Sequence, residues 1–134
     1  MQVRRIEALA VPGREALSVT QHHAAVVRRL YFEMCVIVGH PYHVPPGSTL
    51  SCPDDFGLSY RGVFYAGEKT LAVFSYAASG CEALSLSVGP AQVSTLIYSK
   101  VALAAQLSLD ADLATALGIR ADTIHQRTFA PASR

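Results

Sequence analysis

LSYRGVFY (residues 58–65), AGEK (66–69) and TLAVFSY (70–76) are three consecutive runs, and the rest of the predicted fold can be worked out from them. The two outer runs are rich in aromatic and β-branched residues, which favour strands, and the middle run contains the glycine that a tight turn needs. The stretch therefore predicts a β-hairpin with Gly67 and Glu68 as its two-residue loop. In this register Ala66 faces Lys69.

Two of the three cysteines flank this hairpin. Cys52 and Cys81 fall at nearly matching positions beyond its open end. Paired strands lie about 4.8 Å apart, and a disulfide needs Cα atoms roughly 4.4 to 6.8 Å apart. The register therefore predicts a Cys52–Cys81 disulfide, with Cys35 as the unpaired third cysteine. A reducing compartment would instead leave Cys52 and Cys81 as free thiols.

The chain before the hairpin predicts two strands and a helix. Residues 2–11 and 15–19 have strand-like patterns on either side of a Pro-Gly turn, and a helix is expected from about Gln21 to Ile37, with Thr20 as its N-cap and Gly39 as its terminator. Apolar residues recur along one helical face, namely Ala24, Val27, Tyr31, Met34 and Val38. Lying mostly off this stripe, Arg28, Arg29 and Glu33 are expected on a solvated face.

The chain after the hairpin predicts one strand and further helix. Residues 83–88 alternate strictly, with Leu84, Leu86 and Val88 on one face and Ser85 and Ser87 on the other. This indicates a strand with one buried face. Residues 92–107 have helical spacing, although their β-branched first half could instead extend the sheet. Ser108 is expected to cap a last short helix that ends before Gly118.

These elements indicate one α+β domain over residues 1–120. The expected architecture is an antiparallel sheet of about five strands in ββαβββα order, with the helices packed mainly on one face. Residues 121–134 are expected to form a polar tail.

Composition excludes several classes of function. The chain has 51% hydrophobic and 16% charged residues and a formal net charge of +1, so neither disorder nor a nucleic-acid partner is expected. The charge-free residues 34–53 contain glycine, prolines and histidines, so no transmembrane segment is predicted. The first residues lack the apolar run of a secretory leader. Phosphate-binding and dinucleotide motifs are absent, and no cofactor is expected.

Five short stretches occur together in this chain, namely VVRRLY (26–31), PPG (45–47), SCPDDFG (51–57), SGC (79–81) and LATALG (113–118). In these stretches the sequence resembles a group of small actinobacterial proteins that have no assigned activity and are often secreted or lipoprotein-like. The resemblance covers about residues 15–118 and implies a paired Cys52 and Cys81 and an extracytoplasmic location, with the cytoplasm as the alternative. It implies no catalytic residues. This chain departs from the group in lacking a leader and in carrying Cys35.

Two chemical alternatives involve the region from His40 to Asp55. His40, His43, Cys52 and Cys81 are ligand types that zinc takes tetrahedrally, and they define a possible metal site. A small hydrolase could instead use a cysteine thiolate with His43 as base and Asp54 or Asp55 as orienter. Against both alternatives, the histidines can simply be exposed in a proline-rich loop, and the aspartates can cap the turn into the hairpin.

The expected function is that of a non-catalytic interaction or structural module. Tyrosines are enriched where proteins meet partners, and several lie in the central strands and in the loop from His40 to Gly47. The predicted binding surface combines this loop with the sheet face that the first helix leaves uncovered, and its partner would be a protein or a small molecule. The alternative is that the strand aromatics fill the core. The candidate surface residues are Tyr42, His43, Tyr60, Tyr65 and Tyr76.

Overall fold

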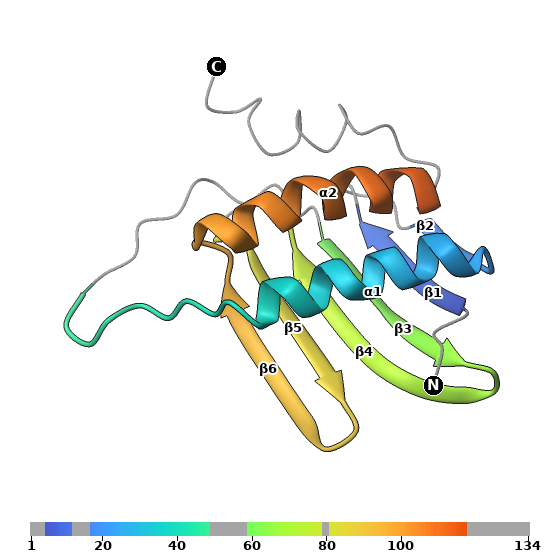
Figure 1. The fold of residues 1–134 in the computed structure, drawn as a ribbon, viewed down its shortest axis with the longest axis horizontal. Helices are drawn as coiled ribbons and strands as arrows, with labels where there is room; N and C mark the ends of the chain where they lie inside the picture. Colours follow the sequence, from blue (N-terminus) through green and yellow to red (C-terminus); the bar gives the residue numbers. More distant parts are fainter. Residues whose placement is uncertain (1–4, 12–16, 49–58, 79–80, 118–134) are drawn as a thin grey trace.

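The structure is a computed structural model that describes residues 5–11, 17–48, 59–78 and 81–117. Two strands, a helix, four further strands and a second helix follow one another along the chain (Figure 1). They are β1 (Arg5–Val11), β2 (Leu17–Gln21), α1 (Ala24–Val38), β3 (Ser59–Ala66), β4 (Lys69–Ala77), β5 (Ala83–Val88), β6 (Ala91–Leu96) and α2 (Lys100–Leu117).

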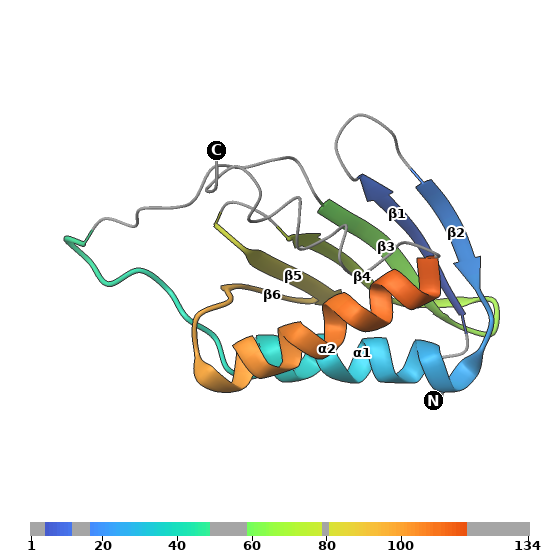
Figure 2. The ribbon, with the colours of Figure 1, turned by 90° about the horizontal axis from the view of Figure 1, so that it is seen from above.

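The strands form one antiparallel sheet in the order β2-β1-β3-β4-β5-β6. The two helices lie side by side on one face of this sheet, and their chain directions are opposite (Figures 1 and 2). The sheet thus has one covered and one open face, as is common for antiparallel sheets. The α+β class predicted from the sequence is confirmed.

The central hairpin is also confirmed. Ala66 pairs with Lys69 and Tyr65 with Thr70, as the two-residue loop requires. Gly67 has a φ of 66°, a conformation that favours glycine. The register shifts by one residue between Phe64 and Tyr65, where a β-bulge interrupts the ladder. Beyond this bulge, Tyr60 pairs with Tyr76.

The hydrophobic core lies between the helices and the covered face of the sheet. The rings of Phe64 and Phe74 lie 5.4 Å apart, and Tyr31 from α1 meets Phe64 edge-on at 5.2 Å. Such offset aromatic contacts stabilise beyond the area they bury. The largest fully buried side chains are Tyr60, Tyr76, Phe64, Phe74, Leu30, Met34, Ile37, Leu84, Leu109 and Leu113.

Helix α1 begins later than predicted. Thr20 and Gln21 belong to β2, and the N-cap residue is His23. The side chain of Gln21 accepts a hydrogen bond from the backbone N–H of His23 at 3.0 Å. The C-cap is Gly39, as expected, and its N–H donates to the carbonyl of Cys35 at 2.9 Å.

The region after β5 corrects the sequence prediction. Residues 91–96 form a sixth strand, β6, rather than the start of a helix, because their β-branched side chains fit a pleated sheet. The helical pattern then continues without a break from Lys100 to Leu117. Ser108 therefore lies inside α2 and does not cap a separate helix. Gly118 and the predicted tail lie outside the described residues.

The open face of the sheet carries small and polar side chains. Ser75, Ser85 and Ser94 lie directly opposite one another on three neighbouring strands. The hydroxyl of Ser94 donates to that of Ser85 at 2.9 Å. Val73 is on the same face and is 48% exposed. The aromatic residues of β4, in contrast, point to the helices.

Among the described residues, no helix combines the length and the apolar composition that crossing a membrane requires.

Candidate functional site

The outer side of α2 is unusually apolar for a surface helix. Val101, Leu103 and Leu107 are 46, 41 and 66% exposed, respectively. The helical spacing places Leu103 and Leu107 on one flank of α2 and Val101 on the other, and all three lie off the side of the buried Ala102, Leu109 and Leu113. No described residue covers them, so α2 presents apolar side chains to solvent on both flanks. Faces of this kind mark binding sites in soluble proteins.

A groove runs between α2 and α1 next to this face. Phe32, which is 66% exposed, projects from α1 beside it. The groove has a volume of about 470 Å³. Most of its walls are apolar or small side chains, and its charged residues come from α1. The lining residues are Arg29, Phe32, Glu33, Val36, Val101, Ala104, Ala105 and Ser108.

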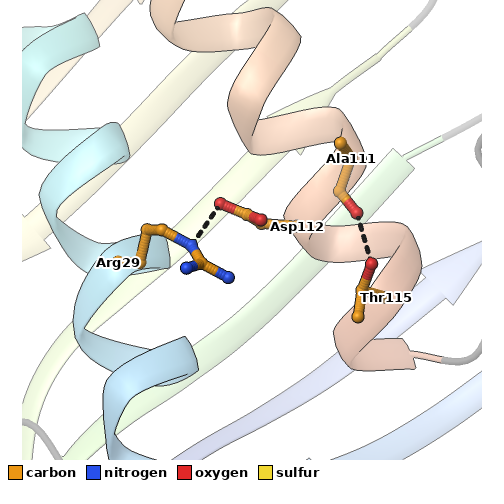
Figure 3. Close-up of polar contacts among 4 residues, drawn as sticks. All are labelled: Arg29, Ala111, Asp112 and Thr115. Carbon is orange, nitrogen blue, oxygen red and sulfur yellow. Dashed lines mark hydrogen bonds and ion pairs between the residues drawn. The ribbon is translucent and has the colours of Figure 1, made fainter.

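One ion pair joins the helices at one end of the groove. Arg29 of α1 donates from Nε to Oδ2 of Asp112 on α2 at 2.9 Å (Figure 3). The side chain of Arg29 is 56% exposed and that of Asp112 only 16%. Close by on α2, Thr115 donates to the backbone carbonyl of Ala111, a bond within one helical turn. The carboxylate is thus held between the helices, while the terminal nitrogens of the guanidinium point outward.

Glu33 is buried beside this pair, which corrects the prediction of a solvated position. Glu33 is 6% exposed, and its Oε1 atom is buried without a hydrogen-bond partner among the described residues. The pKa of Glu33 is raised to about 8, first by burial and then by the hydrogen bond to Asp112 and the negative charge of that residue, whereas Arg29 acts to lower it. Glu33 therefore keeps its proton at neutral pH, and the protonated carboxyl can hydrogen-bond Asp112.

This burial predicts a pH-dependent effect of Glu33→Gln. Between pH 4.5 and 8 the unfolded chain ionises at this position while the folded protein keeps its proton, so the free energy of unfolding falls as pH rises. The glutamine variant does not titrate. From pH 4.5 to pH 9, the free energy of unfolding of the variant minus that of the native protein is expected to rise by about 1 to 2 kcal/mol. This is less than the full effect of the pKa shift, because water in the groove screens part of it.

Urea unfolding at both pH values measures this difference. Glu68→Gln, on the exposed hairpin turn, is the matched control for the loss of one negative charge. A Glu33→Gln effect that is the same at both pH values would contradict the buried protonated state.

The charges that the two helices expose have one sign. Their exposed charged residues are Arg28, Arg29 and Lys100, whereas Glu33, Asp110 and Asp112 are buried or largely covered. Arg28 lies one turn before Phe32 on α1, and Lys100 directly precedes Val101 on α2. Because the helices are antiparallel, basic side chains lie at both ends of the groove.

The structure corrects the predicted tyrosine surface. Tyr60 and Tyr76 are 1 and 0% exposed, and their rings stack in the core 5.8 Å apart. The bulge and the strand pleat direct them toward the helices rather than toward the open face. Tyr65 is half-buried at the bulge. The alternative that strand aromatics fill the core is thus the one the structure supports.

A buried polar cluster holds Tyr76 in place. Its hydroxyl donates to Oδ1 of Asp110 at 2.6 Å and accepts from Nε2 of Gln106 at 2.9 Å. The same Gln106 nitrogen donates to Oε2 of Glu82 at 2.8 Å. The hydroxyl of Tyr60, by contrast, is buried and has no hydrogen-bond partner in the part of the chain that the structure describes. Burial and then the charge of Asp110 raise the pKa of both tyrosines, so both hydroxyls stay protonated.

The loop after α1 places Tyr42 against the last strand. The backbone of Tyr42 donates to the hydroxyl of Thr95 at 2.7 Å and accepts from the N–H of Leu96 at 3.2 Å. Its half-buried ring lies 4.9 Å from that of Tyr98, which is 51% exposed. His43, the next residue in the chain, is exposed. This part of the predicted surface is accessible, and it also covers the edge of β6.

The described residues include only some of the side chains that the metal and hydrolase alternatives require. His40 is exposed, and its Nδ1 atom lies 2.9 Å from the carbonyl of Val36. No group of three metal-ligating side chains gathers within residues 5–11, 17–48, 59–78 and 81–117. Cys52, Asp54 and Asp55 lie outside the described residues, so both alternatives and the Cys52–Cys81 disulfide stay predictions. Cys35 is a free, half-buried thiol whose pKa is raised by burial.

Sequence analysis missed the groove. The available signal was the composition of residues 100–117, where three charged residues accompany many apolar ones. Dividing this segment between two predicted helices hid that exposed apolar residues continue along one long helix, α2.

Comparison with protein-family models, with curated proteins and with solved structures found no match. The resemblance to small actinobacterial proteins therefore stays a prediction.

Proposed function

We propose that the chain is a non-catalytic interaction module that binds a partner protein with the outer face of its two helices. The observation that carries this proposal is the exposure of Phe32, Val101, Leu103 and Leu107 on a helical layer that no described residue covers. Single exposed apolar residues are ordinary, whereas several large ones on one helical layer favour binding, and Phe32 and Val101 also line the groove.

The groove chemistry supports binding more than catalysis. Among the described residues, its lining contains no histidine or cysteine, the residue types that the hydrolase alternative requires. The carboxyl of Glu33 in this lining is protonated at neutral pH and lies against Asp112, which is itself paired with Arg29. The remaining lining side chains are apolar or small, as in surfaces that bury an apolar partner.

Affinity purification with surface variants tests this function. Phe32→Ser combined with Leu107→Ser removes apolar groups that are 66% exposed, so the fold is expected to persist. Val73→Ser, on the open sheet face, is the matched control. We expect partners that the native chain and the control retain at equal levels to be lost at least tenfold from the double variant, and the binding to be reproduced with purified partner. Equal retention by all three proteins would overturn the proposal.

A disulfide between Cys52 and Cys81 is the second part of the proposal, as a staple that closes the segment containing the central hairpin. Cys81 lies two residues before β5, next to the open end of that hairpin. The register argument and the free state of Cys35 support this pairing.

Mass spectrometry of an alkylated, non-reduced digest tests the pairing. We expect the peptides of Cys52 and Cys81 to be joined, and Cys35 to be alkylated. Alkylation of both Cys52 and Cys81 in protein prepared under oxidising conditions would contradict the disulfide.

A further inference from the structure

We propose that the groove binds an amphipathic helix of a partner protein, about three turns long, with acidic residues at both ends of its apolar side. This inference rests on the proposed function and names the chemistry of the partner.

The length of the groove sets the length of its occupant. The lining residues run from Arg29 to Val36 on α1 and from Val101 to Ser108 on α2. At 1.5 Å per residue each side spans about 10.5 Å, or two turns of helix. A further turn brings the ends of a bound helix to the basic residues outside the lining. A concave surface between two packed helices accepts a third helix in the manner of helix-in-groove recognition.

The charges at the ends of the groove determine the ends of the occupant. Arg28 and Arg29 lie at one end, where Asp112 neutralises one of them, and Lys100 lies at the other end. The ion pair with Asp112 uses the Nε atom of Arg29, and the terminal guanidinium nitrogens of this 56% exposed side chain point away from Asp112, where they can meet a carboxylate (Figure 3). Acidic side chains are the groups that complement both ends and steer association.

The same charges argue against a second copy of this chain as the occupant. Two copies that meet antiparallel through this face would place arginines of one against Lys100 of the other, which is unfavourable. A lipid surface would meet the exposed Phe32 and Leu107 but would leave the concave lining between the helices unfilled.

An NMR titration of the full chain tests the inference. The probe is a synthetic helical peptide of about 11 residues, or three turns, with leucines on one side and two glutamates at each end, and the matched peptide has lysines in place of the glutamates. We expect the glutamate peptide to bind at least tenfold more tightly and to shift the amides of Phe32, Val101 and Ser108, which line the groove. The Arg28→Gln, Lys100→Gln double variant should lose most of this preference, since exposed basic side chains carry it.

Each other outcome overturns the inference in a recognisable way. Equal affinity for both peptides, or shifts confined to the sheet, would exclude an acidic helix. Tighter binding to phosphatidylglycerol vesicles than to the glutamate peptide would point to a membrane, and concentration-dependent dimerisation that Phe32→Ser abolishes would point to a second copy. If natural partners still require Phe32 and Leu107 while the glutamate peptide does not bind preferentially, the inference fails and the proposed function stands.

Discussion

Tyr76→Phe is expected to lower the free energy of unfolding by about 1 to 3 kcal/mol, because it leaves a buried carboxylate and a buried amide without their shared partner. The hydroxyl of Tyr76 donates to Asp110 and accepts from Gln106. Urea unfolding followed by circular dichroism measures this change.

Tyr60→Phe is the matched control for this prediction. Tyr60 pairs with Tyr76 across the central hairpin, and its hydroxyl is equally buried but has no hydrogen-bond partner among the described residues. Removing that hydroxyl is expected to leave stability within about 0.5 kcal/mol of the native value or to raise it. Similar losses for both variants would show that ring packing, and not the polar cluster, distinguishes these positions.

Phe74→Ala is expected to lower the free energy of unfolding by about 3 to 5 kcal/mol, because it removes a buried ring and leaves a cavity. Phe74 is 1% exposed and contacts Phe64. Val73→Ala changes the adjacent residue, which is 48% exposed on the open face, and is expected to cost less than about 1 kcal/mol. Thermal and urea unfolding of the two variants compare the faces of one strand. Comparable losses would contradict the assignment of the covered face.

The local elements of this fold could be predicted from residues that are close in sequence. The turn at Gly67, the strict alternation of residues 83–88 and the helix stop at Gly39 each depend on a few neighbouring residues, and the structure contains all three. The boundary between β6 and α2 could not be placed, because its β-branched residues fit both a strand and a helical pattern.

The candidate site could not be predicted because it requires two segments far apart in the sequence. Glu33 was expected in solvent from the pattern of α1 alone, and it is buried because Asp112 and the rest of α2 pack beside it. The groove between Phe32 and Val101 exists only once the two helices lie side by side.

The sequence by itself determined that this chain forms an antiparallel sheet with helices, because the period of apolar residues and the turn glycines act locally. Only the tertiary structure decided which face of the sheet is covered. Strands β3 and β4 carry apolar side chains on both faces, with Val63 and Val73 on one and Phe64 and Phe74 on the other. The alternation of side chains along a strand assigns residues to the two faces but does not show which face is buried. The packing of α1 and α2 decides this, because it covers the aromatic face and leaves the valine face open.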